Sequence, residues 1–193
     1  HIMQRVNLAV FSDGSGRGTA SAHLVDCNGV VCGQTALKYD DRRITVGALE
    51  LCGIVLGLDM VMRFAETLGA DQALSVVFYC DNIPMVDYSR ASSAGDGTLP
   101  CDEHLNQIHG LLRARVDRLR DAGHIWEIWS PRRLRRANRI KYADLQARLA
   151  TQGRSDDIQA IPDDLLAALL HCTDVLRDAR RSNWSDYATM VRL

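Results

Sequence analysis

The sequence lacks the long apolar run that a membrane-spanning helix requires. Its best candidate, residues 49–62, is interrupted by Glu50 and Asp59, whereas a span needs roughly 18 consecutive apolar residues. The N-terminal segment also lacks the charged, apolar and small-residue regions of a secretory signal peptide. We therefore expect a cytoplasmic protein without a membrane partner.

The sequence also lacks paired cysteines. None of its cysteines forms a C-x-x-C pair, and the six are Cys27, Cys32, Cys52, Cys80, Cys101 and Cys172. Their spacing fits neither a zinc ribbon nor a small disulfide scaffold, and several lie inside apolar runs. We predict buried, reduced thiols.

Neither sign of charge is in excess, since 23 basic and 24 acidic side chains give a formal net charge of -1. This sum hides an asymmetry, because residues 132–141 hold six basic residues and no acidic one. A near-neutral chain with one basic stretch can bind a polyanion locally and stay soluble. The 193 residues, 47% of them hydrophobic, suit one domain with an appended helical piece.

The N-terminal part has the pattern of an antiparallel meander. The apolar run 5–12 ends in a glycine-rich cluster at 13–18, which predicts a buried strand followed by a turn. Two further runs, 19–26 and 29–37, flank Asn28-Gly29, a strong hairpin signal. These patterns predict three consecutive strands.

The remaining elements alternate between helix and strand. Apolar residues at helical spacing predict a helix over 46–68 that stops at Gly69, and the run 73–80 predicts a central parallel strand. We then predict a short helix from Pro84, a loop over 91–101, a helix over 102–121, a strand over 124–130, and helices over 138–150 and 162–181. This order predicts an α/β fold in which helices pack on a mixed sheet, with the last helix covering a sheet face or edge.

Four isolated carboxylates stand at strand ends or on helices, and Asp13 and Asp81 would lie side by side if the first and fourth strands were neighbours. Asp13 and Asp81 follow the first and fourth strands, Glu50 lies one turn into the first long helix, and Asp144 lies in the last core helix. Carboxylates this close would repel one another unless a cation lay between them, and their hard oxygen atoms favour Mg²⁺ or Mn²⁺ over zinc. Two such ions roughly 3.5–4 Å apart can activate a water and stabilise the leaving oxygen of a phosphodiester.

Four motifs resemble ribonuclease H and occur in that family's order over roughly residues 5–150: FSDGSGRG, ALELCGIVLGL, YCDN and NRIKYADLQARLA. The resemblance implies a ribonuclease H-like mixed five-stranded sheet with flanking helices over 4–150. The tail over 151–193 has no recognised counterpart in the family, and its own pattern predicts a helical C-terminal extension. The resemblance also implies two Mg²⁺ or Mn²⁺ ions held by the four carboxylates, and hydrolysis of the RNA strand of an RNA–DNA hybrid that leaves a 3′-hydroxyl.

The sequence departs from the family at two places. Val46 and Gly47 stand where cellular members carry an Asn pair, and the loop 130–138 contains no His. The arginines of that loop cannot replace the His as a proton shuttle, because guanidinium stays charged. Two alternatives therefore stay open: a nuclease or resolvase of this fold acting on DNA or structured RNA, and a non-catalytic nucleic-acid-binding module. The oligomeric state also stays open.

Further residues are candidates for contact with nucleic acid. The backbone N–H groups of Gly14, Ser15 and Gly16 could meet a sugar or phosphate, or the three could simply form a turn. Asn82 could bond a base edge or a 2′-hydroxyl, although a helix cap is favoured. The basic residues predicted to bind phosphates are Arg132, Arg133, Arg135, Arg136 and Arg139. We interpret His124, Trp126 and Trp129 as structural.

Overall fold

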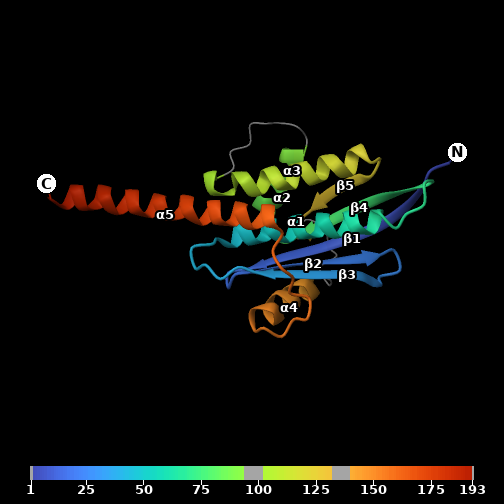
Figure 1. Ribbon diagram of the computed structural model, residues 1–193, viewed down its shortest axis with the longest axis horizontal. Helices are drawn as coiled ribbons and strands as arrows, with labels where there is room; N and C mark the ends of the chain where they lie inside the picture. The colour runs from blue at the N-terminus through green and yellow to red at the C-terminus, as the bar shows by residue number, and fades with distance from the viewer. Residues whose placement is uncertain (1, 94–101, 132–139, 193) are drawn as a thin grey trace.

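A five-stranded mixed sheet forms the centre of the molecule (Figure 1). The computed structural model describes residues 2–93, 102–131 and 140–192, and describes side chains for 2–91, 102–131 and 145–180. The strand order is β3-β2-β1-β4-β5, and the strands are β1 (Gln4–Ser15), β2 (Thr19–Asp26), β3 (Val31–Lys38), β4 (Gln72–Cys80) and β5 (Ile125–Trp129). The first three strands are antiparallel, while β4 pairs parallel to β1 and β5 parallel to β4. The predicted mixed sheet is confirmed.

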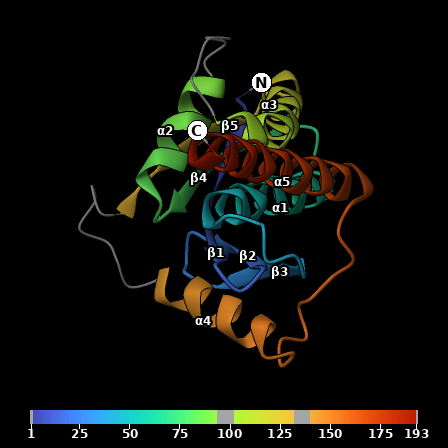
Figure 2. The same cartoon turned by 90° about the vertical axis from the view of Figure 1, so that its left-hand side faces the viewer.

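Helices cover both faces of this sheet (Figure 2). They are α1 (Val46–Ala65), α2 (Ile83–Ser93), the short 3-10 helix η1 (Glu103–Leu105), α3 (Asn106–Asp121), α4 (Ile140–Thr151) and α5 (Asp163–Arg192). Helix α4 lies on the face opposite α1 and packs against β1 and β2. Within the described ranges no helix is both long and apolar enough to cross a membrane.

Helix α1 is the central helix of the fold, buried between the sheet and the helices above it. Its N-cap is Thr45, whose side-chain oxygen accepts a hydrogen bond from the Ala48 N–H at 3.2 Å. Its glycines allow close contact with the sheet, because a Cβ at Gly57 would lie 2.8 Å from Val10 Cγ1. The apolar face predicted from the sequence therefore packs directly on β1.

Strand β1 is longer than the sequence pattern predicts. It continues to Ser15, since Asp13 and Gly14 pair with Ser21 and Ala20 of β2. The chain reverses only after Ser15, whose carbonyl accepts from the Gly18 N–H at 3.1 Å. The interpretation of Asp13 and Gly14 as turn residues was wrong, because both are held in the sheet ladder.

The helix boundaries also differ in places. Helix α1 ends at Ala65 with Glu66 as its cap, so Gly69 does not terminate it. Helix α2 continues to Ser93, where a loop had been predicted, and residues 94–101 of that loop lie outside the described residues. The predicted helices 102–121 and 138–150 correspond to η1 with α3 and to α4.

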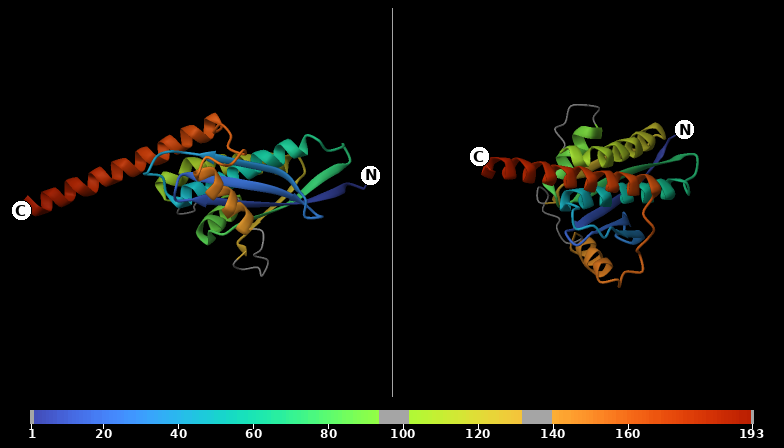
Figure 3. Two further views of the ribbon diagram at one scale, coloured as in Figure 1. Left: turned by 90° about the horizontal axis from the view of Figure 1, so that it is seen from below. Right: turned by 60° about the vertical axis from the view of Figure 1, so that its left-hand side comes forward.

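The C-terminal extension is helical, as predicted, but it packs on helices instead of covering the sheet. Leu165, Leu169 and Cys172 of α5 belong to the same buried cluster as α1 and α3. The buried Arg115 side chain of α3 links three helices, because it donates to Asp59 of α1 at 2.7 Å and to Asp164 of α5 at 2.9 Å. Beyond these contacts α5 extends past the end of the sheet where β1 finishes (Figures 1 and 3).

The segment before α5 covers the edge of the sheet that β3 forms. The Ala36 N–H of β3 donates to the Asp157 carbonyl at 3.0 Å, and the Gln159 N–H donates to the Ala36 carbonyl at 2.8 Å. This segment before α5 satisfies the backbone groups of an edge strand, which would otherwise offer a template for pairing.

Of the cysteines, Cys52, Cys80 and Cys172 are buried free thiols, as predicted. Cys27 and Cys32 are exposed, so the prediction of burial was wrong for them, because Cys27 lies in the turn between β2 and β3 and Cys32 lies near the start of the edge strand β3. Cys101 lies outside the described residues.

Candidate metal centre

Two of the four predicted carboxylates end neighbouring strands. In the β1–β4 register Ser12 lies opposite Cys80, so Asp13 and Asp81 follow at adjacent positions of the same sheet edge. Asp13 is 9% exposed, and its Oδ1 accepts a hydrogen bond from the Gly14 N–H at 2.9 Å. The sequence-based expectation that strands one and four place these residues side by side is confirmed.

Glu50 reaches this edge from α1 because two glycines let the helix approach the strand. A Cβ at Gly14 would lie 2.5 Å from the Glu50 backbone nitrogen, and one at Gly53 would lie 3.0 Å from the Asp13 carbonyl oxygen. Any larger side chain at Gly14 would push the helix away. Gly14 thus has a structural function that the sequence alone did not reveal.

The Glu50 carboxyl lies beside that of Asp13 and away from water. Glu50 is 6% exposed, its side chain is within hydrogen-bonding reach of Asp13, and Cys80 Sγ donates to its Oε2 at 3.4 Å. Burial and the negative charges of Asp13 and Asp81 raise the pKa of Glu50 from 4.5 to about 8.

This donor set fits a hard divalent cation in its chemistry, since carboxylate oxygens are what Mg²⁺ and Mn²⁺ prefer. Within the residues that the structure describes, no three His, Cys, Asp or Glu side chains form a group able to hold a metal by themselves. Asp144 lies on α4, but its side chain is outside the described set. The hydroxyl of Thr19 fixes α4 on β2 by donating to the Ala147 carbonyl at 3.0 Å.

Of the residues predicted to contact the substrate, Asn82, Ser15 and Gly16 lie within the described part of the structure and the arginines do not. Asn82 caps α2, with its Oδ1 accepting from the Met85 N–H at 3.2 Å, which is the favoured structural alternative. Ser15 ends β1 and Gly16 follows it, where a Cβ would lie 3.3 Å from Val46. The basic residues Arg132, Arg133, Arg135, Arg136 and Arg139 lie outside the described residues.

The residues interpreted as structural divide into two groups. His124 Nδ1 accepts from the Leu74 N–H at 3.0 Å, and Trp126 is buried, so both interpretations are confirmed. Trp129 is 37% exposed, and the Arg90 guanidinium lies 3.8 Å from its ring centroid. Trp129 is therefore not a core residue, because β5 is an edge strand and its alternate residues face outward.

Sequence reasoning missed one group near the site. His104 of η1 lies 3.3 Å from Thr45 Oγ1, the cap of α1, measured from its Nε2. No spacing signal links these two residues, because they are 59 positions apart in the sequence and meet only in the folded chain.

Comparison with solved structures supports the fold. The RNase H1 of the halophilic archaeon Halobacterium salinarum NRC-1 superposes with a TM-score of 0.51 at 15% identity, covering 77% of this chain and 98% of that one. The PFV RNase H domain gives 0.53 at 11% identity, covering 80% of this chain and 98% of the domain. No family model and no curated protein matches the sequence. The chain therefore has the ribonuclease H-like fold.

Proposed function

We propose that this protein is a metal-dependent endonuclease that hydrolyses the RNA strand of RNA–DNA hybrids. Asp13, Glu50, Asp81 and Asp144 would hold two Mg²⁺ or Mn²⁺ ions, and the arginines of 132–139 would bind phosphates. Bound at this edge, such ions would activate a water and stabilise the leaving oxygen of the phosphodiester.

The observation that carries this proposal is the buried carboxyl pair of Glu50 and Asp13. Burying one carboxylate next to another costs free energy, since each disfavours the charged form of its neighbour. A scaffold that needed only stability would have no use for the pair, whereas a cation bound there would make both charged forms favourable. The ribonuclease H-like fold agrees with this proposal, because both structures compared above are described as RNase H proteins.

The protein's own residues have distinct roles in this proposal. Gly14 and Gly53 set the distance of α1 from β1, so that Glu50 and Asp13 are positioned before any ligand binds. The Gly14 N–H holds one oxygen of Asp13 in place. Such preorganisation reduces the rearrangement needed when the substrate binds.

The start of α1 bears on which nucleic acid the protein would cut. Val46 is 45% exposed at the start of α1 and Gly47 follows it, so neither side chain can donate a hydrogen bond to an RNA minor groove. This observation favours a second candidate, a nuclease of the same fold that cuts DNA or structured RNA.

A substrate panel in Mg²⁺ tests both candidates. We expect cleavage of an RNA–DNA hybrid in preference to double-stranded DNA, double-stranded RNA and single strands, and complete loss of cleavage in Asp81→Asn. Asp117→Asn is the matched control, because Asp117 is an exposed acid on α3. Cleavage of another substrate only would support the second candidate, and near-normal cleavage by Asp81→Asn would refute the site.

Calorimetry with Mn²⁺ addresses the third alternative, a non-catalytic module. The wild type should bind Mn²⁺ and Asp81→Asn should bind it much more weakly, with the Asp117→Asn control unchanged. Binding that does not depend on Asp81, together with no cleavage of any substrate, would favour the non-catalytic module.

A further inference from the structure

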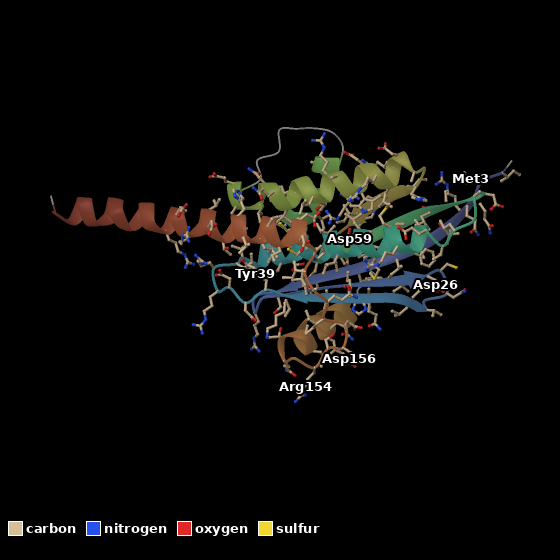
Figure 4. The ribbon with its side chains drawn as sticks, viewed as in Figure 1. Met3, Asp26, Tyr39, Asp59, Arg154 and Asp156 are labelled. Carbon is tan, nitrogen blue, oxygen red and sulfur yellow. The ribbon has the colours of Figure 1, made fainter. Side chains whose placement is uncertain are left out.

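Helix α5 leaves the domain well before its C-terminal end. Its first turns pack on the core through Leu165, Leu169 and Cys172, each of which is 0% exposed. Thr173 is the last buried residue among the side chains of α5 that the structure describes, and its Oγ1 lies 3.2 Å from the Tyr39 hydroxyl. Figure 4 shows Tyr39 beside α5 at this point, and Figures 1 and 3 show the rest of the helix projecting past the domain.

The face of α5 that packs on the domain continues into this projecting segment, residues 174–192. Residues three or four positions apart share a helix face, so one stripe runs through Leu165, Leu169, Cys172, Leu176 and Ala179. Along the stripe the first three side chains are buried, Leu176 is partly buried against the core, and Ala179 is exposed. The same spacing continues at positions 183, 187 and 190, which carry Asn, Tyr and Met. The stripe therefore runs on past the buried part of the helix.

The projecting segment would gain stability from a second element on this stripe. Residues 182–185 are Ser-Asn-Trp-Ser, and none of them is a strong helix former. Most helical stability in proteins comes from packing of an apolar face, so a helix of this composition is marginal in water by itself.

The sequence of the projecting segment matches itself when it is read in reverse about Asn183. Apolar positions then fall on apolar positions: 175 on 191 (Val and Val), 176 on 190 (Leu and Met), and 179 on 187 (Ala and Tyr). Two identical helices that run antiparallel about a twofold axis place such matched positions level with each other. The stripe of one copy would thus meet the stripe of the other, with Asn183 at the axis.

The charges also favour an antiparallel pair. Asp174 is matched with Arg192, Arg180 is matched with Asp186, and no charge is matched with a like charge. In a parallel, in-register pair each of these charges would lie level with its own copy and would be repelled by it. The segment holds four arginines and three aspartates, so it lacks the strong excess of positive charge that favours binding of a nucleic-acid strand. A second copy of the chain therefore fits the segment better than a polyanion does.

The same register leaves room for both domains. The segment starts directly after Thr173 and has Asn183 at its midpoint, and its 19 residues span roughly 28 Å. Antiparallel pairing over this length brings the end of the partner helix level with the point where α5 leaves the domain. A register shifted towards the domain would drive the partner helix into it, and one shifted away would leave part of the stripe uncovered.

We propose that the chain forms a symmetric dimer in which residues 174–192 of two copies pair antiparallel about Asn183. The proposal does not depend on the nuclease function, because it uses no residue of the candidate metal centre. Two helices of this length bury less surface than a standard protein interface, so the dimer should be reversible, with a Kd of roughly 1–10 μM.

Sedimentation velocity of the full chain, over about 1 to 100 μM, measures this association. The wild type should change from one chain to two with rising concentration, and Tyr187→Asp/Met190→Asp should raise Kd at least roughly tenfold, because it places charges on the stripe. The matched control is Ser185→Asp/Ala188→Asp, which adds the same charge to the opposite face of the same turns and should keep the wild-type Kd. Thermal unfolding of each variant checks that the domain stays folded.

Cysteine crosslinking tests the direction and register of the pair. In a background in which Cys27, Cys32 and Cys101 are changed to Ser, Asn183→Cys should form a disulfide-linked dimer on mild oxidation, because its two copies face each other. Ala179→Cys should not crosslink with itself, since its two copies would lie roughly 12 Å apart along the helix axis. A mixture of Ala179→Cys with Tyr187→Cys should crosslink.

Three results would overturn the proposal. The first is a wild type that stays a single chain at about 100 μM, or a Tyr187→Asp/Met190→Asp variant that associates as the wild type does. The second is an Ala179→Cys variant that crosslinks with itself while its mixture with Tyr187→Cys does not, which would mean parallel pairing. The third is a monomeric wild type whose Tyr187→Asp/Met190→Asp variant binds an RNA–DNA hybrid more weakly, which would assign this helix face to nucleic acid.

Discussion

Replacing Glu50 by Gln should make the metal-free protein more stable at neutral pH. The pKa of Glu50 is about 8 in the folded protein, whereas its ordinary value is 4.5. Between these values the folded state keeps a proton that the unfolded chain has lost, so stability falls as pH rises from 4.5 to 8. At pH 7 the loss amounts to about 3 kcal/mol, at about 1.4 kcal/mol for each pH unit.

The Glu50→Gln variant removes this cost without changing the packing. Glutamine has nearly the same volume, and its carbonyl oxygen can still accept from Cys80 Sγ, which lies 3.4 Å from Glu50 Oε2. For a chain of this length, about 3 kcal/mol corresponds to a rise in Tm of roughly 6–12 °C.

The assay is thermal unfolding in EDTA at pH 7 and at pH 4.5, followed by circular dichroism. We expect Glu50→Gln to melt at higher temperature than the wild type at pH 7, and the two to converge at pH 4.5. Added Mg²⁺ should then stabilise the wild type more than the variant. A Tm at pH 7 equal to or below that of the wild type would refute the argument, as would an advantage that persists at pH 4.5.

Four further variants test contacts of the fold, each by the free energy of unfolding in urea. Gly14→Ala should lower the free energy of unfolding by about 1–3 kcal/mol, because its Cβ would meet the Glu50 backbone. Gly110→Ala is the control, because nothing lies within 4 Å of its Cβ, and it should raise the free energy of unfolding by about 0.5–1 kcal/mol. Burial lowers the pKa of His109 to about 4, so wild-type stability should fall between pH 6.5 and 4, and His109→Leu should reduce that fall by roughly 2–3 kcal/mol at pH 4.5. Arg115→Met should lower the free energy of unfolding by about 2–3 kcal/mol, because it leaves the carboxylates of Asp59 and Asp164 without their shared cation. A variant whose free energy of unfolding equals that of the wild type would contradict the contact it was chosen to test.

Local patterns were enough to predict most of the secondary structure. The Asn-Gly hairpin, the helical spacing after Val46 and the apolar run before Asp81 each depend on residues close in sequence. A mixed sheet followed as well, because a meander followed by strand–helix alternation permits few architectures, whereas the order β3-β2-β1-β4-β5 came only from the structure. Boundaries were less accurate where sheet pairing overrode the turn preference of Asp13 and Gly14.

The position of the carboxylates could be predicted only in part. The sequence placed Asp13 and Asp81 at the ends of two strands, and the parallel pairing of β1 with β4 brings them to the same sheet edge. The burial of Glu50 against Asp13 depends on the distance between α1 and β1, which Gly14 and Gly53 set through contacts between segments far apart in the sequence.

The amino-acid sequence alone thus determined which elements form and which acidic residues end them, because hydrophobic period and turn chemistry act over a few residues. Only the tertiary structure decided that α5 packs on α1 and α3. The packing of α5 depends on contacts across more than a hundred residues, such as that of Tyr39 with Thr173, which no local pattern encodes.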